Sequence, residues 1–528
     1  MQQSNSPSCV PRSTFGVNLK EQEEQLMTDP LVRRFAESRR ALAADPHRPL
    51  YHFASPESTM NDPNGLCFWQ GRWHLFYQAI TNPPPGRITH WGHAVSKDLV
   101  RWRDLPFAIH PGPEECCYSG TTLVEEDRVI AMYHGTRAGN MVAVSSDPLL
   151  LNWEKVTGGP VIPMCGDDSE DARRKGPDGS PLPYRVHDPC IWRKDGVYYS
   201  LSNGTLPGAG GKQYRANFLF RSKDLAHWEY LHPFVEDDRF TLAGDDGACP
   251  YFWPIGDRHI LVFFSHMSGG QYLLGDYDTG RDKFLATAHG RFTFGASTPA
   301  AVQSPSATPD GKGGLIVIFC MNRGKPAQGW DQLMTLPRRL TLSGAEDVHV
   351  APAGDIESLR GRRRSLPAMT LRANREVVLD GIEGNALEIA AEIDPGEASV
   401  MEMCVLRSPG GEEYTRILFL RKRGFRRTKR FYPPPRHYSL IGIDSTRSST
   451  LADATCRAPE MAPVLVEDGE PLRLRVFVDR SVVEVFANDK QCAAVRVYPG
   501  RRDSVGVSLR AQGCDARLMS LEAWEMGC

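Results

Sequence analysis

The feature that most constrains this chain is a strand–turn–strand unit that returns within a long region of short strands. Between residues 52 and 342, runs of aromatic and β-branched residues alternate with Gly, Pro, Asn and Asp, which indicates strands joined by tight turns. The segment SKDLVRW at residues 96–102 returns as SKDLAHW at 222–228 and, more loosely, as SSDPLLLNW at 145–153. Such repetition is typical of propeller blades, with an irregular β-sandwich as the alternative.

The segments on either side of this region have different patterns. Before it, Leu31, Phe35 and Leu42 recur at helical spacing among helix formers, so we expect a helical extension over residues 1–47. Strands resume near the C-terminus with cleaner alternation. In one of them, Leu474, Val476 and Val478 share a face, with Arg475 and Phe477 on the other, as expected for a sandwich with one buried face per sheet.

These patterns predict an all-β fold with a short N-terminal helical lead-in. We place a propeller domain at residues 48–345 and a β-sandwich domain at residues 370–528. The charged, Gly-containing stretch at residues 346–369 reads as a linker between them.

Composition excludes several classes of partner. The formal net charge of −2 provides no overall field to attract nucleic acid or an anionic membrane. No apolar run is long enough to span a bilayer, and the first twenty residues lack the apolar core of a signal peptide. The thirteen cysteines, mostly in apolar runs, fit reduced thiols. We therefore expect a cytoplasmic protein without nucleic-acid or membrane partners, and a homo-oligomer stays open.

Two further features point to solvated or structural roles. The basic segment RKRGFRRTKR at residues 421–430 lies between predicted sandwich strands and contains a Gly, so a solvated hairpin is favoured over a nucleic-acid patch. His134, His187 and His266 fall near channel-facing segments but lack metal-ligand spacing. We infer no metal. Because nucleotide-binding motifs are also absent from the sequence, we infer no cofactor.

Paired carboxylates are the remaining candidates for chemistry. Asp62 in MNDPNG and Asp188 in HDPCIW each precede a proline, which restricts the backbone of the preceding residue. Asp245 and Asp246 form an adjacent pair in AGDDGACPYFWPIG. Each motif alone is more typical of a turn. Together, with aromatic residues beside each, they favour a carbohydrate cleft at the centre of the propeller.

These motifs resemble, in order, those of glycoside hydrolase family 32, the β-fructofuranosidases, which include invertases, inulinases, levanases and fructosyltransferases. The likeness covers roughly residues 50–528 and is carried by the segments MNDPNGLCFWQGRWHLFYQ, HWGHAVSKDLVRWRDLPFAIHPG, CYSGTTLV, HDPCIW, ACPYFWPIG and LRVFVDRSVVEVFAND. The resemblance implies a five-bladed propeller followed by a sandwich.

The resemblance also implies roles. Asp62 would be the nucleophile that forms a covalent fructosyl intermediate, and Asp188 would steady the transition state without reacting. Asn61, Gln78, Trp91 and Ser119 match family positions that line the fructose subsite. Retaining glycosidases also need an acid/base about 5–5.5 Å from the nucleophile.

The chain departs from the family at two positions. The Arg that precedes the stabilising Asp is replaced by His187, with Arg185 two positions earlier. The Glu that serves as acid/base is replaced by Ala248, which cannot transfer a proton. We therefore predict Asp246 as the acid/base, with Asp245 as the second candidate.

The function predicted from the sequence is hydrolysis of β-fructofuranosyl linkages in sucrose, fructo-oligosaccharides or fructans by double displacement. Two alternatives stay open. One is a fructosyltransferase that uses the same intermediate. The other is a non-catalytic fructan-binding protein, because of Ala248.

Overall fold

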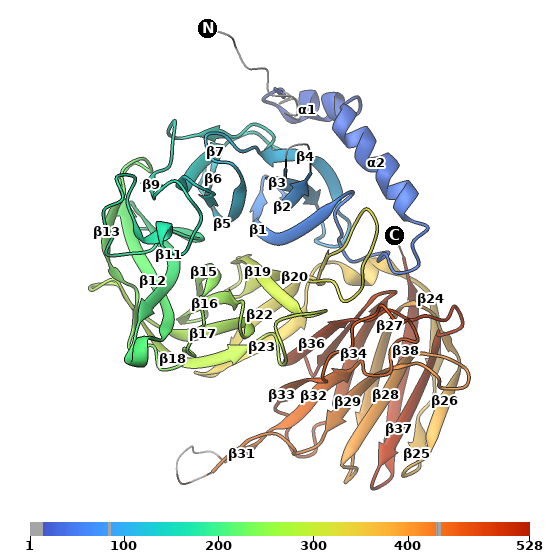
Figure 1. Ribbon diagram of the computed structural model, residues 1–528. Coiled ribbons are helices and arrows are strands. Elements are labelled where there is room, and N and C mark those ends of the chain that lie inside the picture. The colour runs from blue at the N-terminus through green and yellow to red at the C-terminus, as the bar shows by residue number, and fades with distance from the viewer. Residues whose placement is uncertain (1–13, 83–85, 429, 431–434, 528) are drawn as a thin grey trace.

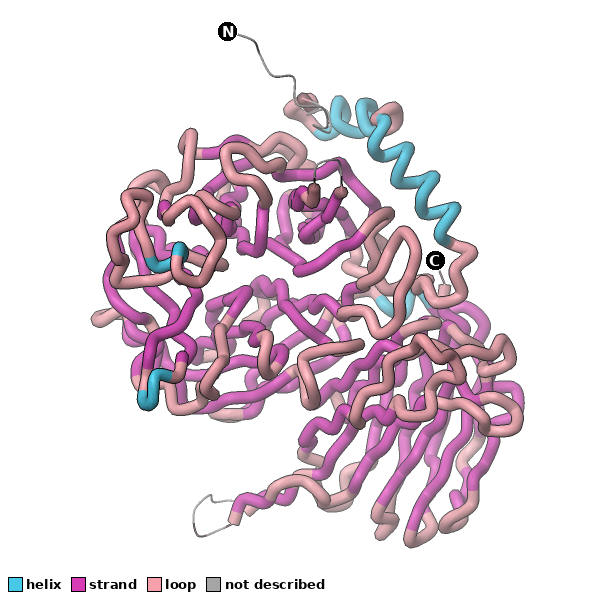
Figure 2. Tube along the Cα trace, in the orientation of Figure 1, coloured by secondary structure: helices cyan, strands magenta, loops and turns pink. Residues whose placement is uncertain are grey.

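The computed structural model describes residues 14–82, 86–428, 430 and 435–527. Figure 1 shows two helices beside a ring of sheets, followed by a layered β domain at the C-terminal end, and Figure 2 shows how fully strands dominate the chain. The predicted all-β fold class with an N-terminal helical lead-in is confirmed. Within the described residues, neither helix is long and apolar enough to cross a membrane.

The helical extension consists of α1 (Leu19–Leu26) and α2 (Pro30–Leu42). Asp29 caps α2, accepting the backbone N–H groups of Leu31 and Val32, and Pro30 fits the first helical turn because no intrahelical bond is needed there. Phe35 is buried against Phe107 of the propeller, with ring centroids 5.7 Å apart. The extension is thus attached to the propeller through its apolar stripe. Its first residues, 1–13, lie outside the described part of the chain.

Five mainly antiparallel sheets form the blades of the propeller, and each has a strand at the centre of the ring (Figure 1). The first two blades contain β1 (Thr59–Trp69), β2 (Arg72–Thr81), β3 (Ile88–Ser96) and β4 (Arg103–Ile109), then β5 (Cys117–Val124), β6 (Val129–Gly135), β7 (Gly139–Ser145), β8 (Glu154–Lys155) and β9 (Ile162–Pro163). The third contains β10 (Pro189–Lys194), β11 (Val197–Pro207), β12 (Gln213–Ser222) and β13 (Glu229–Pro233). The fourth contains β14 (Val235–Glu236), β15 (Ala248–Ile255), β16 (Arg258–Ser265), β17 (Gly269–Asp278) and β18 (Lys283–Arg291). The fifth contains β19 (Val302–Pro309), β20 (Leu315–Met321), β21 (Leu333–Met334), β22 (Arg338–Ser343) and β23 (Asp347–Pro352).

The repeated sequence unit marks the same turn in three blades. It joins the third strand to the outer strand: β3 to β4, β7 to β8, and β12 to β13. In the first copy, Asp98 accepts the backbone N–H groups of Val100 and Arg101, and Leu99 has a φ of +69°. Asp224 accepts the equivalent bonds in the third blade, where Leu225 has a φ of +68°. The central Asp therefore stabilises a turn that requires a left-handed residue.

The C-terminal domain is a sandwich of a seven-stranded and a six-stranded sheet. The first contains β24 (Arg360–Leu366), β25 (Met369–Leu371), β27 (Ala386–Asp394), β34 (Leu472–Asp479), β35 (Val482–Ala487), β36 (Gln491–Arg496) and β38 (Ala516–Met526). The second contains β26 (Glu376–Glu383), β28 (Val400–Arg407), β29 (Thr415–Leu420), β32 (Ser439–Asp444), β33 (Glu460–Val464) and β37 (Gly506–Gln512). A hairpin of β30 (Arg426–Arg427) and β31 (Arg436–His437) carries the basic segment, of which residue 429 lies outside the described residues.

The stretch predicted as a linker, residues 346–369, instead contains β23 and β24, each of which pairs with a strand outside this stretch. β23 completes the fifth blade, and β24 is an edge strand of the sandwich. The side chains of β24 are largely exposed, so its sequence lacks the alternation that marks a strand with one buried face. Only residues 353–359 separate the two domains, and four of them form the 3₁₀ turn Ile356–Leu359.

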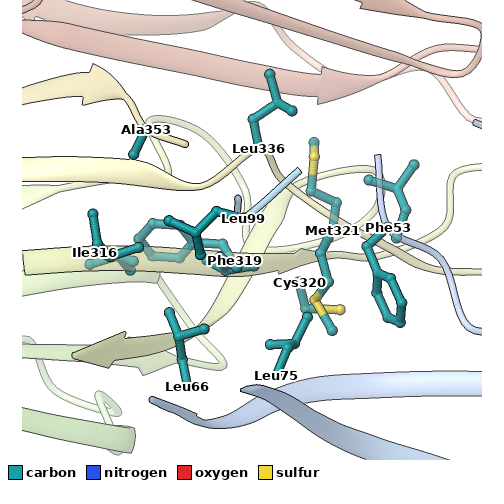
Figure 3. Packing of buried hydrophobic residues seen from close by; sticks show 14 of the residues in the cluster. Phe53, Leu66, Leu75, Leu99, Ile316, Phe319, Cys320, Met321, Leu336 and Ala353 are labelled. Atoms are coloured by element: carbon teal, nitrogen blue, oxygen red, sulfur yellow. The ribbon is translucent and has the colours of Figure 1, made fainter. Parts of the chain in front are cut away.

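The two domains share one apolar core. Side chains of the fifth blade pack there with residues of the first blade, as Figure 3 shows for Phe319, Met321 and Leu75. Phe477 and Phe486 of the sandwich belong to the same cluster. β34 and β35 are therefore largely buried on both faces, since one face lies in the sandwich core and the other against the propeller.

Candidate active site

The inner strands of the five blades each bring one polar or sulfur-bearing side chain to the centre of the ring, immediately before a Pro or Gly. These residues are Asp62, Ser119, Asp188, Cys249 and Ser304, followed by Pro63, Gly120, Pro189, Pro250 and Pro305. In β1, β5, β15 and β19 the strand register shifts at this point, so each strand has a bulge there. A bulge redirects a side chain out of the regular alternation. These four irregularities, together with Asp188 immediately before β10, build one site.

Asp62 is held by hydroxyl and amide donors from three strands. Its Oδ2 accepts hydrogen bonds from Ser119 Oγ at 2.6 Å and Gln78 Nε2 at 3.0 Å, and its Oδ1 accepts one from Ser304 Oγ at 2.5 Å. Burial raises the pKa of Asp62, the two serine hydrogen bonds lower it, and the negative charge of Asp188 raises it, leaving the pKa above its ordinary value. The donors fix the direction of the carboxylate.

Asp188 is held by contacts with Cys249 and His187. Its Oδ2 accepts the backbone N–H of Cys249 at 3.0 Å, and its Oδ1 lies 3.2 Å from His187 Nδ1. The Cys249 thiol is 3.6 Å from an oxygen of each carboxylate. Burial alone would raise the pKa of Asp188, but His187, the nearby His134 and the Cys249 N–H together hold it well below its usual range. Asp188 is therefore a fixed negative charge.

Both carboxylates line a cavity of about 910 Å³ that opens at the centre of the propeller. Asn61, Gln78 and Ser119 also line it, in line with their predicted places. A second hollow of about 1050 Å³ lies along outer strands of the first two blades and contains neither carboxylate. Within the described residues, no group of three or more His, Cys, Asp or Glu side chains is arranged to hold a metal ion.

Both residues considered in place of the family Arg reach the cavity. Arg185 is buried and donates from Nη1 to Thr205 Oγ1 at 2.7 Å. His187 Nδ1 lies 3.0 Å from Asn203 Oδ1 in addition to its contact with Asp188. Arg185 thus presents a cation to the cavity, and His187 contacts Asp188.

Trp91 occupies a different place from the one predicted. Its side chain is fully buried between Phe76 and Tyr133 and is not among the residues that line the cavity. Its ring N–H donates to the carbonyl of Tyr118 at 2.9 Å, and Tyr118 does line the cavity. Trp91 therefore lies behind the wall of the cavity and supports Tyr118.

The structure separates the two adjacent acids. Asp245 is fully buried and accepts hydrogen bonds from Ser265, Ser268 and the backbone of Leu242. Burial raises its pKa, but these bonds outweigh that effect and leave the pKa below its ordinary value. Asp246 instead lines the cavity and pairs with His266, whose Nδ1 lies 2.6 Å from Oδ2. Asp245 is therefore a structural residue, and only Asp246 faces the site.

Sequence reasoning missed several residues of the cavity wall. Ser304 escaped notice because a lone Ser carries no signal, although its position before Pro305 repeats that of Asp62 before Pro63. Arg173, Arg174 and Glu170 come from a long segment between β9 and β10 that has little regular structure. His266, for which the sequence indicates only a structural role, has a side chain that is 73% exposed and lines the cavity.

Two buried carboxylates that converge in a cavity at the centre of a propeller are typical of one class of protein, the carbohydrate-cleaving enzymes. Comparison with known families identifies the family to which the chain belongs. The profile "Glycosyl hydrolases family 32 N-terminal domain" matches residues 52–352, and "Glycosyl hydrolases family 32 C terminal" matches residues 355–525. The chain belongs to glycosyl hydrolase family 32 and is a glycosidase, so the resemblance seen in the sequence is confirmed.

Individual relatives agree with this assignment. Levanase of Bacillus subtilis is 28% identical over 90% of this chain and 70% of its own length. The cell wall isozyme of beta-fructofuranosidase from Pisum sativum is 27% identical over 86% of this chain and 89% of its own length. Among solved structures, fructan 1-exohydrolase IIa from Cichorium intybus has the same fold, with a TM-score of 0.75 at 22% identity, covering 92% of this chain and 98% of that one.

Proposed function

We propose that this protein hydrolyses β-fructofuranosyl linkages by double displacement through a covalent intermediate on Asp62. The observation that carries the proposal is the way the Asp62 carboxylate is held. Three donors on three strands orient it toward the cavity, and preorganisation of this kind is what a nucleophile requires. The names of the relatives, a levanase and a beta-fructofuranosidase, support fructosides as the substrate class.

Asp188 complements Asp62 in this proposal. An oxocarbenium-like transition state carries positive charge on the sugar ring. Asp188 stays ionised because His187 and the Cys249 N–H hold its pKa low. Its fixed charge stabilises the transition state more than the neutral substrate, which is how a binding group accelerates a reaction.

Ala248 keeps a second candidate function in consideration. Its methyl group lines the cavity at the first position of β15 and has no proton to give. A chain without a proton donor would bind fructans without cleaving them, because general acid catalysis contributes roughly 10²–10⁴-fold.

Product analysis separates these functions. The protein is incubated with sucrose, 1-kestose, inulin and levan, and the products are resolved by chromatography. Release of free fructose is the expected result. Longer oligosaccharides would instead assign a fructosyltransferase. Intact substrates together with calorimetric binding would assign the non-catalytic function and overturn the proposal.

A further inference from the structure

The strand pairing beside Ala248 locates a group that could replace the missing donor. Ala248 of β15 pairs with Phe264 of β16 in antiparallel register. Continuing that register by two residues along each strand places Asp246 opposite His266. The structure bears this out: Asp246 Oδ1 accepts the backbone N–H of His266 at 3.1 Å, and Oδ2 lies 2.6 Å from His266 Nδ1. The pair therefore lies next to Ala248, on the cavity side of both strands.

Contacts from the neighbouring blades hold this pair in place. Asn203 of β11 donates to the backbone carbonyl of Asp246 at 3.1 Å. Ser297, which precedes β19, donates to the backbone carbonyl of His266 at 2.7 Å. The ring of Phe264 lies edge-on to the imidazole, with centroids 5.1 Å apart. Because Nδ1 is engaged by Asp246, Nε2 is the nitrogen available to a substrate.

The other acidic groups of the cavity wall are less suited to give a proton. Glu170 forms ion pairs with Arg173 and Arg185, and nearby cations favour an ionised carboxylate. Asp171 pairs with Lys175 and is 75% exposed. The carboxylate of Asp246 is itself paired with His266. In this pair the imidazole carries the proton, because Asp246 raises the pKa of His266.

We propose that His266 is the general acid/base of this enzyme, with Asp246 as the positioning residue that holds its imidazole. This inference rests on the proposed function and completes it, because it supplies the proton that Ala248 cannot. It also changes the role of Asp246 from proton donor to hydrogen-bond partner, the relation that a carboxylate has to the catalytic His in a Ser–His–Asp triad.

The two steps balance as follows. In the first, an Asp62 oxygen bonds to the anomeric carbon of the fructosyl unit, the glycosidic C–O bond breaks, and the Nε2 proton of His266 moves to the departing oxygen. In the second, a water oxygen bonds to the anomeric carbon, neutral His266 takes a water proton, and the ester bond to Asp62 breaks. Both side chains end in their starting forms.

The charges around His266 suit this cycle. The hydrogen bond to Asp246 and the negative charges of Asp246, Asp62 and Asp188 raise the pKa of His266 to about 9, against an opposing effect of burial. The imidazole is therefore protonated near neutral pH, as an acid must be. Esterification removes the charge of Asp62, which lowers the pKa of His266. The imidazole then gives up its proton more readily, so it is available in the neutral form that the second step needs.

The test compares His266→Gln and Asp246→Asn on two kinds of substrate, sucrose and 4-nitrophenyl β-D-fructofuranoside. Sucrose needs its leaving oxygen protonated, whereas nitrophenolate departs unaided. For His266→Gln we expect kcat/KM on sucrose to fall by roughly 10²–10⁴-fold and kcat/KM on the aryl fructoside by less than about tenfold. For Asp246→Asn we expect the alkaline limb of the kcat/KM profile to move to lower pH.

The matched control is His227→Gln. His227 forms the same kind of pair, with Nδ1 2.8 Å from Asp224 Oδ2, but it lies in the exposed β12–β13 turn away from the cavity. This variant should leave both substrates and the pH profile unchanged. Calorimetric binding of fructose and the melting temperature show whether each variant is folded.

Three outcomes decide the matter. Wild-type turnover with an unaffected His266→Gln variant overturns this inference alone. A leaving-group-dependent loss confined to Asp246→Asn assigns the proton to the carboxylate and also overturns it. A wild-type protein that cleaves neither these two substrates nor 1-kestose, inulin or levan removes the proposed function and this inference with it. NMR titration of His266 provides a readout without turnover, with a pKa of about 9 expected in the wild type and a lower one in Asp246→Asn.

Discussion

At the scale of single residues, the site depends on how Asp62 is held. A buried carboxylate is costly unless donors satisfy it. Ser119, Ser304 and Gln78 satisfy both oxygens of Asp62. They also restrict the rotation of the carboxylate, so the attacking oxygen is already oriented toward the substrate. Two predictions follow from this arrangement.

Asp62→Ala should abolish turnover on every fructoside. Because the variant lacks the attacking oxygen, a better leaving group cannot restore the reaction. Hydrolysis of sucrose and 4-nitrophenyl β-D-fructofuranoside, measured side by side, checks this. Rates on the aryl substrate within about tenfold of the wild type would show that Asp62 is not the nucleophile.

Ser304→Ala should weaken catalysis and change its pH dependence. The Ser304 hydrogen bond lowers the pKa of Asp62, so its loss raises that pKa further. The acidic limb of the kcat/KM profile should then move to higher pH. A hydrogen bond to a charged group contributes about 1.5–3 kcal/mol, which corresponds to roughly a tenfold or larger fall in kcat/KM.

The control for Ser304→Ala is Ser399→Ala in the sandwich. Ser399 donates to the carbonyl of Gln512 at 3.3 Å, far from the cavity in the fold. The Ser399→Ala variant should have the wild-type pH profile of kcat/KM. An identical profile for Ser304→Ala would contradict the expected role of Ser304.

At the scale of elements, the bulged inner strands decide where the functional side chains point. In β5 the bulge lies between Cys117 and Gly120, and it directs Ser119 toward Asp62. Gly120 packs so closely on β6 that an added Cβ would lie 2.2 Å from the carbonyl oxygen of Met132 and 2.5 Å from the Cα of Tyr133. The position of Ser119 therefore depends on the absence of a side chain at Gly120.

Gly120→Ala should separate β5 from β6 and move Ser119. We expect a loss of about 1–3 kcal/mol in stability, as for other overpacked sites, together with reduced turnover. Thermal unfolding and kinetics measure the two effects. Gly158→Ala is the control, because its Cβ would meet nothing within 4 Å. Equal melting temperatures for the two variants would show that the strands accommodate the methyl group.

At the scale of the whole molecule, a buried ionic network joins the propeller to the sandwich. His52 contacts Asp479 of β34 through Nδ1 at 2.9 Å and Glu484 of β35 through Nε2 at 3.1 Å. Arg338 of the fifth blade contacts Glu484 at 2.7 Å. All four side chains are fully buried. Removing one partner would leave a buried charge unpaired, so the network makes the two domains depend on each other.

This network predicts a pH window for stability. Burial alone would lower the pKa of His52, but Asp479 and Glu484 raise it to about 9. Burial alone would raise the pKa of Glu484, but Arg338, His52 and the Leu336 N–H lower it to about 2. Stabilisation by His52 is complete below its unfolded pKa of about 6.5 and is lost as pH rises through about 9. Stabilisation by Glu484 is complete above the pKa that its carboxyl has in the unfolded chain, and it is lost as pH falls toward about 2.

His52 and Glu484 should therefore make their full contribution to the midpoint of urea unfolding between about pH 5 and 6.5. His52→Gln should flatten the alkaline limb, because the group that titrates there is gone. His437→Gln, at the β30–β31 hairpin, is the control and should keep that limb. An alkaline limb of unchanged slope in His52→Gln would show that another group causes it.

Much of this organisation could be predicted from the sequence because it depends on local pattern. Strand periodicity and turn chemistry identified the two β domains, and the repeated Ser-x-Asp turn marked three blades. The Asp-Pro motifs singled out Asp62 and Asp188, which converge on one cavity. The prediction of a linker was wrong because β24 is an exposed edge strand, whose residues show no alternation of apolar and polar side chains.

What the sequence by itself determined is therefore the all-β fold, the family and the two central carboxylates, because each is written in short-range patterns of residues. Only the tertiary structure decided that Trp91 supports the cavity from behind, that Asp245 is buried among hydroxyls, and that Asp246 meets His266. These outcomes depend on which strand is innermost and on how two strands pair across a sheet. Strand order within a blade and burial arise from contacts between distant segments, which short-range patterns of residues do not specify.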